Sequence, residues 1–172
     1  IGEKNVELTA EIADGWLPIF FSPERYREAF GASIDAGFAK AGNGKSLENF
    51  DIAPTVTVIV GDDVEQCADF VRPFLALYAG GMGARGANFH FEVFARMGYE
   101  DVALKVQDLY LAGKKQEAAA AIPLQMVEDV ALVGPPDKIR AELDRWRETC
   151  LTEMLISAPK QLLAPYAELI LG

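Results

Sequence analysis

The feature of this sequence that most restricts its fold is a repeated alternation of short apolar runs with longer amphipathic segments. Three of the runs have the length and composition of strands: Trp16–Phe21, Ala53–Val60 and Leu151–Ser157. The second run, APTVTVIV, is rich in β-branched residues and largely apolar, which is typical of a strand covered on both faces of a parallel sheet. Strands that alternate with helices in this way predict an α/β fold built from βα units.

The segments between the strands carry apolar residues at helical spacing. In the segment that opens at Gly134, this spacing places Ile139, Leu143 and Trp146 on one stripe, which we expect to pack against the sheet. The stretch from about residue 80 to 130 is predicted to be mostly helical. Helices are expected over residues 4–13, 22–41, 64–78, 134–150 and 161–171, and short helices broken near Gly98 and Gly113 are expected over residues 88–122.

The number of strands is small for the fold they suggest. The three runs, with Ile1 as the end of a fourth strand, are few for a doubly wound sheet, and a closed eight-stranded barrel takes about 250 residues. We therefore expect residues 1–172 to be a single domain that forms half of such a barrel, with further residues upstream of Ile1. Half a barrel exposes two strand edges and one sheet face, so association with the missing half or with another copy is also expected.

Charge and cysteine content restrict the partners and the compartment. With 26 acidic and 16 basic side chains the net charge is −10, which disfavours binding to nucleic acid or to an anionic membrane surface. No apolar run reaches the roughly 18 residues of a membrane span, and no secretory signal opens the chain. Cys67 and Cys150 fall on apolar helix stripes and are predicted to be reduced, buried thiols, as in a cytoplasmic protein.

Two conspicuous patterns are predicted to be structural. The segment Gly81–Gly86 (GMGARG) matches GxGxxG, but a helix precedes it where a dinucleotide site needs a strand, so we expect it to end that helix and border the barrel mouth. His90 is the single histidine and has no Cys or His partner at metal-ligand spacing. A packed or surface histidine is favoured, and no metal site is predicted.

The opening residues predict an anion site. If Ile1 ends a strand, Gly2 and Glu3 form a βα loop, and Lys4 begins a helix at the carboxyl end of the sheet. Amides at a helix N-terminus bind anions without net positive charge, and glycine permits close backbone approach. On the residues alone, an ordinary tight βα turn is an equally good interpretation.

Several segments together resemble a known family. They are Ile1–Asn5 (IGEKN), Ala10–Pro18 (AEIADGWLP), Ala53–Val56 (APTV), Tyr78–Gly83 (YAGGMG) and Val133–Pro136 (VGPP). In this order the chain resembles the luciferase-like, flavin- or deazaflavin-dependent oxidoreductases. The resemblance implies the C-terminal half of a (β/α)8 TIM barrel, about strands 5–8, with the helical stretch of about residues 80–130 as an insertion after strand 7.

The resemblance also implies a function. It indicates an oxidoreductase that transfers hydride with the deazaflavin coenzyme F420 to or from an unknown small molecule, within a cytoplasmic homo-oligomer. Gly2, Glu3 and Lys4 match the turn that holds the cofactor phosphate, although Glu3 stands where proline is common in the family. Catalytic positions are implied to lie in the other half of the barrel, so none is assigned, and the 172 residues alone are expected to be inactive. An FMN-dependent monooxygenase and a non-catalytic half-barrel for binding or assembly are the alternatives.

Overall fold

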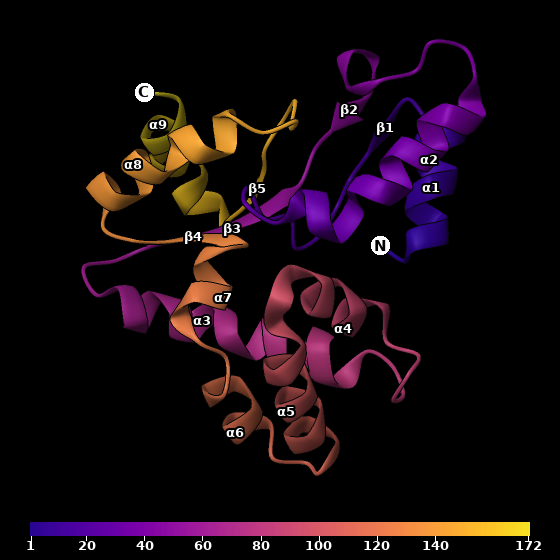
Figure 1. The fold of residues 1–172 in the computed structure, drawn as a ribbon. Coiled ribbons are helices and arrows are strands. Elements are labelled where there is room, and N and C mark those ends of the chain that lie inside the picture. The colour runs from indigo at the N-terminus through magenta and orange to yellow at the C-terminus, as the bar shows by residue number, and fades with distance from the viewer.

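The central strand of the molecule is divided in two by a proline. In the computed structural model, which describes residues 1–172, β2 (Asp51–Ile52) and β3 (Thr55–Val60) flank Pro54. Proline has no N–H to donate to a ladder, which explains the interruption. Figure 1 shows β3 running through the middle of the molecule. The strand predicted over Ala53–Val60 is thus confirmed over Thr55–Val60, whereas Ala53 and Pro54 lie between the two strands.

Two further strands flank the central one on opposite edges. The Ala53 amide donates to the Trp16 carbonyl on one edge, and the Leu155 amide donates to the Pro54 carbonyl on the other, at 3.0 and 2.9 Å. All pairings are parallel. These hydrogen bonds at Ala53 and Pro54 connect the two flanking strands through the divided central strand. The flanking strands are β1 (Gly15–Trp16) and β5 (Leu155–Ser157).

The strands are shorter than the apolar runs predicted. The run Trp16–Phe21 keeps a strand only at its start, because Pro18 cannot donate and Phe20 takes a left-handed φ of 59° that ends the extended backbone. A fourth parallel partner, β4 (Ala131–Gly134), was not predicted. It pairs with Thr57–Val60 on the edge of β3 that β1 leaves free.

Helices cover the sheet on both sides. Figure 1 shows α3 and α7 on one side of β3 and β4, α8 and α9 on the other, and α4, α5 and α6 grouped beyond α3. None of the helices has the length and apolarity needed to cross a bilayer. The α-helices are α1 Glu3–Ile12, α2 Ala32–Ala41, α3 Val64–Ala76, α4 Phe89–Phe94, α5 Glu100–Leu111, α6 Lys115–Ala120, α7 Leu124–Glu128, α8 Pro136–Arg147 and α9 Leu163–Leu171. Three π-helical turns, η1 Arg27–Gly31, η3 Leu77–Gly81 and η4 Ala95–Tyr99, and two 3₁₀ turns, η2 Leu47–Asn49 and η5 Lys160–Leu162, complete the helical elements.

The apolar stripe of α8 is buried, as its spacing predicts. Ile139, Leu143 and Trp146 all belong to the hydrophobic core, and the indole ring lies 6.2 Å from the ring of Phe21. Both cysteines are free thiols; Cys67 is buried and Cys150 is half-buried.

A buried carboxylate attaches the helical segment between α3 and β4 to the loop that follows β1. Asp129, which is buried, accepts hydrogen bonds from Arg25 Nε and the Tyr99 hydroxyl at 2.7 Å, and from Gln125 Nε2 at 2.8 Å. Arg25 also donates to the Met97 carbonyl at 2.9 Å. Burial, together with the hydrogen bond to Asp129, raises the pKa of Tyr99 well above its usual range. The phenol therefore stays a proton donor to this carboxylate at all ordinary pH values.

The contact between α1 and α2 contains a carboxylate held by two lysines. Glu7 is buried in the fold and pairs with Lys4 at 2.7 Å and with Lys40. Hydrogen bonds from Lys4 and Lys40 lower the pKa of Glu7 from 4.5 to about 2. A carboxylate with a lowered folded-state pKa stabilises the fold at neutral pH, and this contribution disappears as the pH falls from about 4.5 towards 2.

Glu7→Gln is therefore expected to lower stability at pH 7 and to flatten the dependence of stability on pH between about 4.5 and 2. Urea denaturation at a series of pH values measures both effects. Glu28→Gln, at an exposed position without an ion pair, serves as the control and should leave the profile intact. A profile unchanged by Glu7→Gln would show that these ion pairs do not contribute to stability.

Candidate functional site

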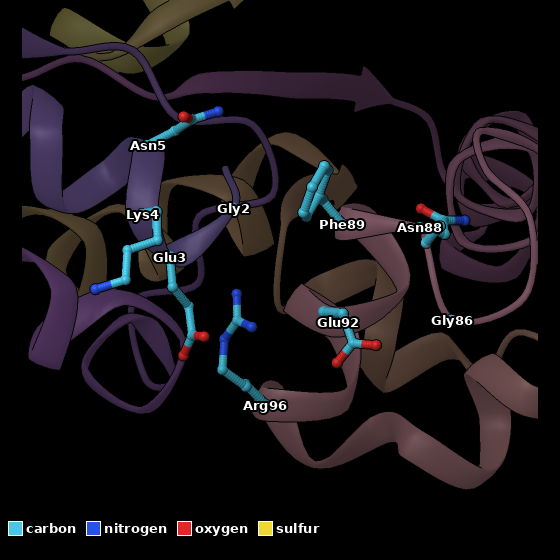
Figure 2. Close-up of a pocket in the computed structure, with 10 residues that line it drawn as sticks. Gly2, Glu3, Lys4, Asn5, Gly86, Asn88, Phe89, Glu92 and Arg96 are labelled. Atoms are coloured by element: carbon cyan, nitrogen blue, oxygen red, sulfur yellow. The ribbon is translucent and has the colours of Figure 1, made fainter.

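A pocket of about 350 Å³ lies between the start of α1 and the start of α4 (Figure 2). The three residues predicted as an anion site, Gly2, Glu3 and Lys4, all line it. The full lining is Gly2, Glu3, Lys4, Asn5, Gly86, Ala87, Asn88, Phe89, Glu92 and Arg96.

The α1 wall presents free backbone donors. The Gly2 carbonyl accepts from the amides of Asn5 and Val6 at 2.9 and 3.0 Å, whereas the amides of Glu3 and Lys4 lie in the first turn and have no intrahelical acceptor. A Cβ at Gly2 would lie 3.0 Å from the Phe89 ring, so glycine allows the close approach of the two walls. Free amides at the positive end of a helix dipole favour an anion.

The two charged side chains at the start of α1 differ in direction. The ammonium group of Lys4 is directed away from the pocket and pairs with Glu7, and its side chain is 89% exposed. Glu3 is exposed at the edge of the pocket, on the side where Figure 2 shows Arg96. The backbone amide of Lys4, rather than its side chain, is therefore the group available to a ligand.

The opposite wall is fixed by a buried asparagine. Asn88 Oδ1 accepts from the amides of His90 and Phe91 at 3.0 and 3.2 Å and so caps α4. Asn88 Nδ2 donates to the carbonyls of Tyr78 and Ala79 at 2.8 and 2.9 Å. The cap thereby joins the start of α4 to η3 and holds this wall in place.

Arg96 supplies a cation that the sequence analysis missed. Its Nε donates to the Ala29 carbonyl at 2.9 Å, while its Nη2 is buried and has no hydrogen-bond partner in the protein. Figure 2 shows the guanidinium group between Glu3 and Glu92, yet Arg96 forms no ion pair with either. Arg96 lines the pocket as a cation without a carboxylate partner, which suits the pocket to an anionic ligand. Only the tertiary fold brings Arg96 to Gly2, and no local pattern around it signals a site.

The glycine motif serves packing. Gly81 ends the helical turn η3, so a helix precedes the motif, in agreement with the sequence argument against a dinucleotide site. A Cβ at Gly81 would lie 2.4 Å from the Tyr110 ring, and one at Gly83 would lie 2.6 Å from the Ala87 carbonyl oxygen. Gly86, with a φ of 72°, ends the motif and lines the pocket.

His90 belongs to an aromatic cluster beside a second pocket. Its ring centroid lies 4.7 Å from that of Tyr78 and 6.1 Å from that of Phe20, and burial lowers the pKa of His90. This is the packed histidine that the sequence favoured. The second pocket has a volume of about 310 Å³ and is mostly apolar; its lining is Ile19, Phe20, Thr55, Thr57, Phe70, Val71, Phe74, Leu75, Val130 and Ser157.

Comparisons with known proteins agree on one family. The sequence profile of the luciferase-like monooxygenases matches residues 1–153. A Mycobacterium tuberculosis protein with the provisional name of coenzyme F420-dependent oxidoreductase Rv3520c is 45% identical over 157 residues, which are 91% of this chain and 45% of that protein.

Two solved structures show the same α/β fold. The coenzyme F420-dependent tetrahydromethanopterin reductase of Methanopyrus kandleri superposes with a TM-score of 0.66 at 20% identity, over 90% of this chain and 42% of that one. An F420-dependent secondary alcohol dehydrogenase, solved with an F420–acetone adduct, gives 0.57 at 15% identity, over 90% and 40%. The chain thus spans less than half the length of the relatives it matches. The profile match over residues 1–153 shows that this chain belongs to the luciferase-like monooxygenase family.

Proposed function

We propose that this chain is part of an oxidoreductase that uses coenzyme F420, and that the pocket between α1 and α4 holds the phosphate group of the coenzyme. One observation carries the proposal: the free amides of Glu3 and Lys4 share a pocket with the unpaired guanidinium group of Arg96. The relatives that are named for coenzyme F420 support the choice of cofactor.

The pocket residues fit a phosphate in number and in chemistry. Two amides and a guanidinium group offer several N–H donors to the phosphate oxygens, and Gly2 leaves the approach to the amides clear. When it is bound, the deazaflavin ring supplies the hydride chemistry. The residues of this chain bind the phosphate and thereby orient the rest of the cofactor. The substrate is a small molecule, and the residues of this phosphate pocket do not determine which one.

We also propose that the chain forms part of a barrel. The parallel pairing of β1 with β2 and of β3 with β5, connected through Ala53 and Pro54, supports an arc of about strands 5–8 of a TIM barrel in one domain, with β4 as an added strand and the helices between α3 and β4 as an insertion. Leu17 and Phe70 are 70% and 74% exposed on the molecule. In the complete protein these side chains are covered by the remaining part of the barrel or by a second copy, in a cytoplasmic assembly.

Gly2→Val is expected to weaken the binding of coenzyme F420 by about tenfold or more, the loss typical of one hydrogen bond to a charged group. The added side chain would collide with the Phe89 ring and displace the amides of Glu3 and Lys4. Fluorescence titration of the intact polypeptide measures the affinity. Gly31→Ala is the matched control, because a Cβ there would meet its nearest neighbour at an ordinary 3.6 Å.

A second ligand isolates the phosphate contribution. The deazaflavin riboside that lacks the phosphate should bind the wild type and Gly2→Val with equal affinity. If Gly2→Val left the affinity for coenzyme F420 unchanged, Gly2 would not belong to the cofactor site.

A further inference from the structure

We propose that the pocket between α1 and α4 selects a singly charged phosphodiester over a doubly charged phosphomonoester, and that Glu3 and Glu92 set this preference. The inference rests on the proposed function, because it concerns the same phosphate site. It bears on the choice between the two cofactors that the family uses, since coenzyme F420 carries a phosphodiester and FMN a phosphomonoester.

The balance of charge in the pocket supports a single negative charge on the ligand. Four ionisable side chains line it: Glu3, Lys4, Glu92 and Arg96. Lys4 is already paired with Glu7, so Arg96 is the one lining cation without a carboxylate partner. Glu3 and Glu92 form no ion pair with any lysine or arginine. The pocket thus offers one cation beside two carboxylates, so a second negative charge on the ligand would add repulsion from Glu3 and Glu92 with no second cation to offset it.

The position of Arg96 keeps this balance fixed. The hydrogen bond from Nε to the Ala29 carbonyl holds the guanidinium group in place, and no carboxylate pairs with this cation, which lines the pocket. The amides of α1 serve a diester and a monoester alike, so they do not discriminate between them. Repulsion from the carboxylates does discriminate. For exposed side chains such as Glu3 and Glu92, several ångströms from the bound charge, it corresponds to roughly a threefold change in affinity per carboxylate.

A pair of flavins separates phosphate charge from every other contact. FMN and riboflavin 4′,5′-cyclic phosphate share the same ring, but the first is a monoester and the second a diester. Flavin fluorescence titration of the intact polypeptide at pH 8, where a phosphomonoester is doubly ionised, gives the ratio of the two affinities. We expect the cyclic diester to bind roughly tenfold more tightly than FMN.

Substitutions test whether Glu3 and Glu92 cause the preference for the diester. Glu3→Gln and Glu92→Gln should each raise the affinity for FMN relative to the diester, and the double variant should remove most of the difference. Glu168→Gln, on α9 and outside the pocket, changes the net charge by the same amount and should leave the ratio unchanged. Arg96→Gln should weaken both ligands.

The outcomes distinguish the two proposals. If both flavins bind, Arg96→Gln weakens them, and the ratio is close to one in every variant, charge selection is wrong while the phosphate site stands. If neither flavin nor coenzyme F420 binds above background, the proposed phosphate site is wrong, and the proposed charge selection is then wrong as well. A preference for the diester that survives the double glutamine variant would also overturn the role of the two carboxylates.

Discussion

Trp146→Ala is expected to lower the free energy of unfolding by about 3–5 kcal/mol, as the truncation of a large core side chain does. The side chain of Trp146 is fully buried, lies beside Ile139 and Leu143 on α8, and faces the ring of Phe21. Alanine would leave a cavity that the surrounding helix and sheet cannot fill without moving. The indole Nε1 has no hydrogen-bond partner, and removal of this unsatisfied donor offsets a small part of the loss.

Chemical denaturation of the intact polypeptide measures this effect. Leu111→Ala is the control, since Leu111 is 50% exposed and its truncation should cost no more than about 0.5 kcal/mol. A loss of less than about 1 kcal/mol for Trp146→Ala would show that α8 does not form part of the core.

The isolated 172 residues are expected to self-associate and to show no oxidoreductase turnover. Leu17, Phe70 and Phe74 are 70%, 74% and 40% exposed, and the last two line the apolar second pocket. Exposed aromatic side chains beside a pocket favour association with another surface. Turnover should be absent because the family resemblance places the catalytic positions outside these residues.

Sedimentation velocity at several concentrations tests the association. Phe70→Ser should reduce it without loss of the fold, because Phe70 has little of its surface buried. Leu111→Ser, at an exposed apolar side chain on α5 outside the second pocket, is the control and should leave association unchanged. A folded monomer of the 172 residues with the cofactor affinity of the intact polypeptide would contradict the half-barrel proposal.

The elements that could be predicted are those whose signal lies in a continuous stretch of sequence. The β-branched run Ala53–Val60 identified the central strand, and the spacing of Ile139, Leu143 and Trp146 identified the buried face of α8. β4 was missed because four apolar residues directly after a helix do not differ in pattern from the end of that helix. The end of β1 was misplaced because the left-handed φ of Phe20 results from tertiary packing among other aromatic rings.

The residues of the candidate site also differ in whether a local sequence pattern could identify them. Gly2, Glu3 and Lys4 could be selected because a glycine before a helix start is a local pattern with a physical meaning. Arg96 could not, because no pattern in the sequence around it signals a site, and its position depends on the contact of η4 with η1. The charge that completes the pocket therefore comes from a part of the chain that no sequence pattern connects to the anion turn.

The hydrogen bonds that fix the helical segment between α3 and β4 bear on how quickly a ligand can bind. Arg96 and Arg25 attach η4 to the segment around η1, and η1 runs directly into α2, which Lys40 joins to α1 through Glu7. The two walls of the pocket are thus parts of one connected body. Their conformational entropy is lost when the chain folds and not when the ligand arrives. Association with a phosphate ligand should therefore follow single-step kinetics whose observed rate rises linearly with ligand concentration, without the plateau that a slow closing motion would impose.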